Sequence, residues 1–143
     1  SSRRQLRSFE RMLEPVGNCV RLVQVLARRA GVLCEDGDKV SDKQIALLEE
    51  LADIALGLST VYQKRTKVIE AQEIPALINR LRDVAAESGT EVLDKNSVLS
   101  AYAILAQTRS VAVDLMIVCG MSRESAVAQL KPTSKTPAFP PEA

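Results

Sequence analysis

The sequence contains no histidine and no tryptophan, and aromatic residues make up only 3% of its 143 residues. Without histidine, the chain lacks the side chain that most often acts as a catalytic base or binds zinc near neutral pH. Its six glycines are scattered, so no glycine-rich phosphate loop is present. These absences argue against an enzyme, and we expect no catalytic, cofactor-binding or metal-binding residues.

Cysteines are few, and the charges nearly cancel. The three cysteines, Cys19, Cys34 and Cys119, form no close pair, and each falls in an apolar stretch. That placement is more typical of buried, reduced thiols than of a zinc or redox site. The formal net charge is only +1, so the chain has no overall field that attracts nucleic acid, and we expect no nucleic-acid partner.

The residues that are abundant are aliphatic. Hydrophobic residues account for 46% of the chain, and the near absence of aromatics leaves Leu, Val, Ile and Ala to build the core. This composition favours helices packed on helices over a sheet. Apolar residues also recur every three or four positions, which is the helical spacing. The sequence therefore predicts an all-α fold, an antiparallel bundle of four main helices plus a short C-terminal helix.

Capping and breaking residues indicate the limits of the first two helices. The first is expected over residues 3–34, with a kink at Pro15 because proline removes one backbone hydrogen bond. An acidic turn containing Gly37 ends it. Ser41 or Asp42 then caps the second helix, and the short turn makes the two helices an antiparallel hairpin.

Later helices are bounded in the same way. The third is expected to start at Ile74-Pro75, and the fourth to end before Gly120. Ser122 would cap the short fifth helix. Accordingly, residues 1–131 are predicted to form the bundle domain and residues 132–143 a Pro-rich tail.

The fourth helix is long and apolar enough to suggest a membrane span. However, it carries Gln107, Arg109 and Asp114, and each central charge costs ~2.5–3.5 kcal/mol on insertion scales. We therefore interpret it as the central helix of a soluble bundle.

Arg109 and Asp114 are the unusual residues of this helix, because charges on an apolar face are costly unless paired. They are five positions apart, so they do not share one helical face. We expect each to form an ion pair with another helix. Arg28 or Arg29 are the candidates for Asp114, and Glu50 or Asp53 for Arg109. A ligand site at Arg109 is the alternative, and Glu50 and Asp53 are otherwise expected to be solvated.

Basic residues gather at one end of the predicted hairpin. The antiparallel arrangement brings together seven of them: Arg3, Arg4, Arg7, Arg11, Lys64, Arg65 and Lys67. Such a basic pole suits an anionic membrane surface, where each charge contributes ~1 kcal/mol. A merely solvated end is the alternative.

Three segments carry a family resemblance. They are NCVRLVQVLARRA at 18–30, ALLEELA at 46–52, and QTRSVAVDL at 107–115 followed by CGMS at 119–122. Together they resemble the cytoplasmic helical region of the aromatic acid exporter family, also called the fusaric-acid-resistance-like family. The resemblance implies a longer parent with transmembrane helices before Ser1, located at the cytoplasmic face of the cell membrane.

The resemblance makes a cytoplasmic accessory domain the leading expectation for function. It would serve assembly or regulation of a membrane transporter-like protein that exports aromatic or other organic acids. The membrane would be reached through the missing N-terminal region, and the wide apolar stripe of the hairpin favours a homo-oligomer. The alternative is a soluble helical ligand-binding or adaptor module with no membrane link.

Overall fold

A computed structural model describes residues 17–32, 40–64, 67–95 and 97–134 of the chain. Within these ranges the fold is all-α, without a strand, as the sequence predicts. The elements are helix 17–32, α2 (Asp42–Lys64), α3 (Lys67–Glu87), a 3-10 turn η1 (Thr90–Val92), α4 (Leu99–Val118) and α5 (Arg123–Ala128). Pro15 and most of the predicted tail lie outside the described residues.

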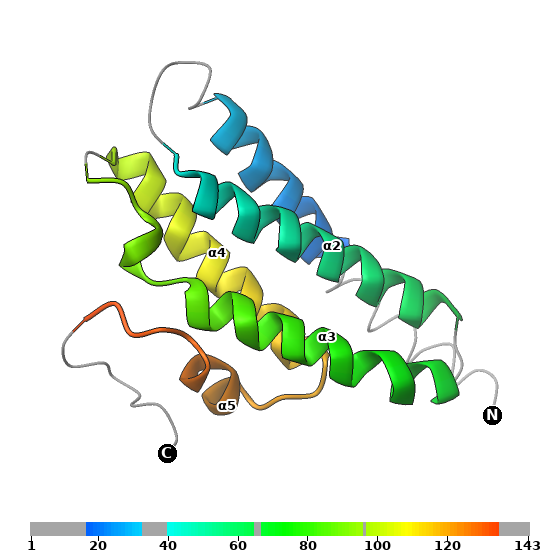
Figure 1. The fold of residues 1–143 in the computed structure, drawn as a ribbon. Coiled ribbons are helices and arrows are strands. Elements are labelled where there is room, and N and C mark those ends of the chain that lie inside the picture. The colour runs from blue at the N-terminus through cyan, green and yellow to red at the C-terminus, as the bar shows by residue number, and fades with distance from the viewer. Residues whose placement is uncertain (1–16, 33–39, 65–66, 96, 135–143) are drawn as a thin grey trace.

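The four long helices run alternately in opposite directions (Figure 1). In this arrangement α2 and α4 are parallel and lie across the diagonal of the bundle. Two hydrogen bonds join them near their two ends: Gln44 Nε2 donates to the Ala101 carbonyl at 3.0 Å, and the Tyr62 hydroxyl donates to the Val118 carbonyl at 3.1 Å. Because the two bonds are separated by a similar number of residues on each helix, they fix the register of α2 against α4.

The N-terminus of α2 is capped by a buried pair, Ser41 and Gln44. The Gln44 amide donates to Ser41 Oγ at 3.1 Å, and Gln44 Oε1 accepts from the Ser41 amide at 3.3 Å. This reciprocal pattern is a capping box, which satisfies two amides that the first helical turn would leave unpaired. Ser41 Oγ also donates to the Val92 carbonyl, so the cap ties α2 to η1 and, through Gln44, to α4.

The third helix begins earlier than the sequence indicates. It starts at Lys67, not at Ile74-Pro75, and Pro75 lies inside it. The residues before Pro75 include Glu70 and Gln72, which are good helix formers. They are largely exposed, so they show no apolar period, and only Ile74 among residues 70–75 packs against the core. Helical propensity therefore extends the helix before Ile74, where the hydrophobic pattern gives no indication of a helix.

Two predicted boundaries near α4 are confirmed. Gly120 has a φ of 105°, the left-handed conformation that favours glycine, and the Met121 amide donates to the Met116 carbonyl at 3.1 Å across it. That bond is the closing link of a Schellman motif. Ser122 Oγ then accepts from the Ser125 amide at 3.1 Å, capping α5 as expected.

The core is a continuous aliphatic cluster to which every long helix contributes. On α2 the buried apolar residues form one broad stripe: Leu47, Leu48, Leu51, Ile54, Ala55, Leu58, Val61 and Tyr62. The stripe faces the interior because α2 contacts both α3 and α4.

We expect Leu51→Ala to lower the free energy of unfolding by ~2–5 kcal/mol, because Leu51 is fully buried and its truncation leaves a cavity. Leu56→Ala on the same helix is the matched control, since Leu56 is 56% exposed. It should change the free energy of unfolding by less than about 0.5 kcal/mol. Urea unfolding followed by circular dichroism measures both, and equal losses would contradict the assigned rotation of α2.

Candidate functional site

Helix 17–32 has one buried stripe and one exposed apolar flank. Its buried residues, Cys19, Val23, Leu26 and Ala30, follow a spacing of four, three and four, which keeps them on one side of a helix. Three large apolar side chains of the same helix are exposed: Leu22 by 37%, Val25 by 41% and Val32 by 50%. At 3.6 residues per turn they lie on a common flank beside the buried stripe.

The three arginines of helix 17–32 share that flank. Arg21, Arg28 and Arg29 fall within the same side of the helix as Val25 and Val32 at this periodicity, and all three are exposed. The helix carries no aspartate or glutamate between residues 17 and 32. Its exposed flank is therefore apolar and cationic at once.

The flank faces the N-terminal half of α4. A groove of about 410 Å³ separates the two helices and is lined by Val25, Arg28, Arg29, Val32, Ser100, Ala103 and Ile104. Beside it, α4 exposes Leu99 by 84% and Tyr102 by 50%. Arg29 Nη1 bridges the groove to Gln107 Oε1, although the distance of 3.5 Å makes this a weak hydrogen bond.

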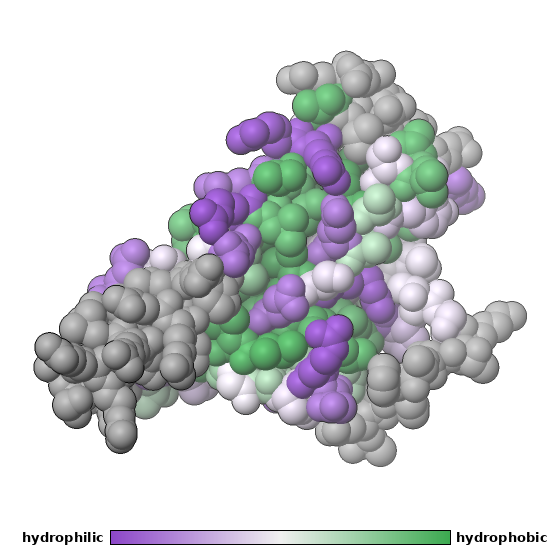
Figure 2. Space-filling view, turned by 180° about the vertical axis from the view of Figure 1, so that it is seen from behind, coloured by the Kyte–Doolittle hydropathy of each residue, from purple (hydrophilic) through white to green (hydrophobic). Residues whose placement is uncertain are grey.

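We call this surface the arginine-edged face and define it by seven residues: Arg21, Leu22, Val25, Arg28, Arg29, Val32 and Leu99. Tyr102 is not part of it, because it lies two turns before Arg109, on the side of α4 that reaches Ser88 at the end of α3. It belongs to the side of the molecule that Figure 2 shows, where apolar surface is bordered by hydrophilic residues. Exposed apolar clusters rimmed by polar groups typically mark interaction sites. Leu22, which is 37% exposed, belongs to this cluster and not to the buried stripe of the helix.

Arg109 does not form the carboxylate pair that the sequence predicts. Its Nη1 donates to two backbone carbonyls, those of Ser88 and Lys131, each at 2.7 Å. Because Ser88 directly follows α3, the guanidinium lies at the negative end of that helix dipole. Partial burial lowers the Arg109 pKa, and the two carbonyls supply the charge stabilisation that we had assigned to Glu50 or Asp53.

Lys131 makes Arg109 part of a clamp. The Lys131 amide donates to the Ala85 carbonyl at 3.0 Å, and its Nζ forms an ion pair with Glu91 at 3.3 Å. The chain after α5 is thereby fastened to the end of α3. Gly89 lies inside this corner, where a Cβ would collide with the Glu91 carboxylate and press on the Lys131 side chain.

The other predicted ion pair is also wrong. Asp114 is exposed, so its charge needs no buried partner. Arg28 and Arg29 line the groove at the N-terminal half of α4, and Arg29 lies opposite Gln107, two turns before Asp114. The negative charge of Asp114 instead contributes to raising the pKa of the Cys19 thiol, which lies at the other end of helix 17–32. The antiparallel direction of the two helices explains the separation.

Glu50 and Asp53 pair with an arginine that the sequence analysis did not single out. Arg80 Nε contacts Glu50 Oε1 at 2.7 Å, and Arg80 Nη2 contacts Asp53 Oδ2 at 2.6 Å. These hydrogen bonds raise the Arg80 pKa and join α3 to α2. The sequence does indicate that these two carboxylates could share one cation, because Glu50 and Asp53 are three positions apart and lie on one helical face. Only the α2–α3 register identifies Arg80 as their partner.

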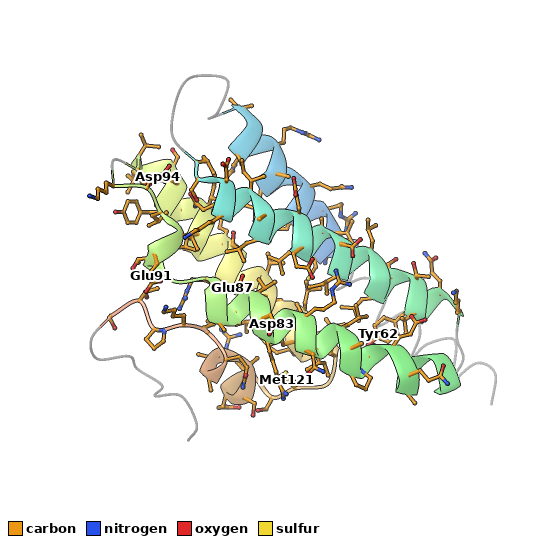
Figure 3. The ribbon with its side chains drawn as sticks, in the orientation of Figure 1. Tyr62, Asp83, Glu87, Glu91, Asp94 and Met121 are labelled. Carbon is orange, nitrogen blue, oxygen red and sulfur yellow. The ribbon has the colours of Figure 1, made fainter. Side chains whose placement is uncertain are left out.

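A second hollow lies beside this network. It has a volume of about 560 Å³, lies between α2, α3 and η1, and carries charges of both signs, including Lys43, Asp83, Glu87 and Lys131. Figure 3 shows Asp83 and Glu87 following each other toward Glu91 along the end of α3. Among the residues that could be searched, no group of three or more potential ligands is placed to hold a metal ion. Several of the charges that line the hollow are paired, Arg80 with Glu50 and Lys131 with Glu91.

The predicted basic pole is mostly outside the described ranges. Arg3, Arg4, Arg7, Arg11 and Arg65 lie there. Lys64 ends α2 and Lys67 begins α3, so these two are close in the chain. The pole remains a prediction.

Two described cysteines are held in the thiol form. Burial is the main cause that raises the pKa of both Cys19 and Cys119 from 9.0 to about 11. Burial also raises the pKa of Tyr62 to about 12, with smaller contributions from Cys119 and Glu70. Both thiols are therefore poor nucleophiles near neutral pH, in line with the expectation of reduced, unreactive cysteines.

Of the described helices, α4 alone is long and apolar enough to cross a membrane, and half of it is buried within the bundle. A core helix of a globular domain meets the same criteria.

The comparisons with known proteins give one relative and no function. The chain is 56% identical over 140 residues to an uncharacterized protein of Corynebacterium glutamicum. The match covers 98% of this chain but 36% of that protein, so the chain spans about a third of its relative's length. No protein-family model matches the chain, and no solved structure matches it.

We expect Arg109→Met to lower the free energy of unfolding by ~1–2 kcal/mol, because two carbonyls lose a charged donor. Amide exchange at Lys131 should also accelerate, since the clamp holds that segment. Arg82→Met, at an exposed position of α3, is the control and should leave both readouts unchanged. Unaltered exchange at Lys131 in Arg109→Met would show that the clamp does not hold the segment.

Stability should decline at alkaline pH. The folded state favours the protonated thiols, so their contribution is complete below pH 9 and disappears as pH rises through 11. The expected loss is on the order of 1–3 kcal/mol, measured as urea midpoints between pH 8 and 11. The Cys19→Ala/Cys119→Ala variant should show a shallower decline, retaining the part due to Tyr62. Parallel declines in the two proteins would assign the effect to other groups.

Proposed function

We propose that the chain is a cytoplasmic accessory domain of a membrane transporter-like protein, with a role in assembly or regulation. The observation that carries this proposal is the arginine-edged face, on which apolar side chains as exposed as Leu99 adjoin three arginines. Exposed apolar surface of this kind is typical of domains that bind another protein or a membrane.

Two further points support the proposal. The Corynebacterium glutamicum relative is much longer than the matched region, which fits a domain that belongs to a larger protein. The segments 18–30, 46–52 and 107–115 resemble the cytoplasmic region of the aromatic acid exporter family, which suggests aromatic or other organic acids as the exported compounds. Homo-oligomer formation through the bundle is part of the same proposal.

The soluble ligand-binding or adaptor module is the second candidate, and the groove favours it. A volume of about 410 Å³, with apolar walls and Arg28 and Arg29 at the edge, is in the range of small-molecule sites. Arg109 is not the anchor of such a site, because its guanidinium is engaged by carbonyls.

Fractionation of the native cells separates the two candidates. An antiserum raised against the 143-residue chain should detect a polypeptide larger than 15.6 kDa that stays in the membrane pellet after alkaline carbonate extraction. Protease should remove the epitope from inverted vesicles and spare it in right-side-out vesicles, because the domain faces the cytoplasm. A carbonate-soluble protein would reject the transporter proposal and favour the soluble module.

The transport part has its own test. An in-frame deletion of the domain should raise the sensitivity of cells to an aromatic acid such as benzoate, while the remaining protein still reaches the membrane. Unchanged sensitivity to a panel of aromatic and aliphatic acids would remove organic-acid export from the proposal.

A further inference from the structure

The arginine-edged face combines exposed apolar side chains with arginines, which are the two kinds of group that bind a lipid surface. Its apolar members come from two neighbouring helices, with Leu22, Val25 and Val32 on helix 17–32 and Leu99 at the start of α4. A helix that combines an apolar flank with arginines is typical of segments that lie at the boundary of headgroups and acyl chains. Arginine suits this position because its long apolar stem packs along the surface while the guanidinium reaches outward to phosphate.

Charge complementarity indicates an anionic occupant. Helix 17–32 has three arginines and no acidic residue. Among the described residues, Asp114 lies near the Cys19 end of that helix; the acidic turn at 35–38, which follows the helix in the chain, lies outside the described residues. The acidic residues of α2 and α3 that line the second hollow, Glu50, Asp83 and Glu87, belong to a different surface. The charges of helix 17–32 are therefore all positive, and they lie on the side of the helix that is also apolar.

The same asymmetry argues against a second copy as the occupant. A symmetric dimer places the same surface of each subunit against the other, so arginines 21, 28 and 29 would face their own counterparts. An anionic lipid surface instead offers phosphates to the arginines and hydrocarbon to the valines. The groove between helix 17–32 and α4, with Val25, Val32 and Ile104 on its walls, provides an apolar recess at the same place.

We propose that the arginine-edged face docks on an anionic lipid bilayer, with Leu99 and the valines at the acyl boundary and the arginines on headgroup phosphates. The proposal rests on the proposed function only in that a membrane must be near the domain. It places the contact on described residues of helix 17–32 and α4, separate from the basic pole at the N-terminus and the α2–α3 junction.

The test uses the 143-residue chain and large unilamellar vesicles of phosphatidylcholine with or without 30% phosphatidylserine. Co-sedimentation should show binding to the anionic vesicles that is at least tenfold stronger than to phosphatidylcholine alone, and that weakens with added salt. The Arg21→Gln/Arg28→Gln/Arg29→Gln variant should lose about a hundredfold in affinity, the amount expected for three cations near an anionic surface.

A control variant removes the same charge elsewhere. Lys43→Gln/Arg82→Gln/Arg123→Gln changes three exposed cations on α2, α3 and α5, and should lose less than about fivefold, an effect of net charge alone. Circular dichroism of both variants verifies that each folds. Equal losses in the two variants would reduce the binding to net charge and overturn the proposal.

The outcomes also separate this inference from the proposed function. Vesicle binding that is unaffected by the arginine replacements would assign the contact to the basic pole and overturn the inference while leaving the transporter proposal intact. A dimer in light scattering that dissociates in Val25→Ser/Val32→Ser, with no vesicle binding, would make the face a self-contact and equally overturn it. Vesicle binding that requires the three arginines, together with a carbonate-soluble native protein, would uphold the inference and reject the transporter.

Discussion

The diagonal contact between α2 and α4 decides which surfaces of this bundle remain exposed. Gln44 meets Ala101 near one end of the two helices and Tyr62 meets Val118 near the other. With the diagonal closed in this way, α4 turns its most buried side toward α2, while helix 17–32 and α3 lie at its flanks (Figure 1). One side of α4 remains, and α5 covers its C-terminal half, where Val113 faces Val127. The N-terminal half, from Leu99 to Ala106, has no such cover.

Polar groups at the ends of the helices reinforce this geometry without relying on paired charges. Ser41, Gln44 and Tyr62 each donate to a backbone carbonyl across the bundle, and Arg109 donates to two. Carbonyls in or after the last turn of a helix, such as those of Val118 and Ser88, lack an intrahelical partner. A buried donor that reaches such a carbonyl satisfies both groups, which would otherwise be desolvated without a hydrogen bond. The Ala101 carbonyl differs, because it lies in the first turn of α4 and receives the Gln44 hydrogen bond at a position where the helix also provides a donor. The ion pairs of Arg80 and Lys131 lie at the surface and contribute less.

The sequence predicts the helices well because periodicity and capping are local properties. Ser41, Gly120 and Ser122 act as the sequence indicates, and the four-helix bundle follows from the aliphatic pattern. Pro75 misleads, because a proline that suits a first turn is also tolerated inside a helix whose neighbours have strong helical propensity. The partners of Arg109 and Arg80 depend on the rotation and register of three helices. Hydrophobic period fixes each rotation only to within a residue or two, so those contacts could not be derived from the sequence.

The exposure of Leu22, Val25 and Val32 also depends on the rotation of their helix, which the hydrophobic period alone does not fix. This rotation explains why the arginine-edged face exists. Six of the sixteen positions in helix 17–32 are valine or leucine, which is more than one buried stripe accommodates: Val20, Leu22, Val23, Val25, Leu26 and Val32. Rotating the helix to bury Val25 would carry Arg28 and Arg29 toward the aliphatic core, where an unpaired charge costs several kcal/mol, on the order of what a whole buried side chain contributes. Cys19, Val23, Leu26 and Ala30 therefore face inward. The arginines set the rotation of the helix, and the apolar residues beside them are left for whatever binds the domain from outside.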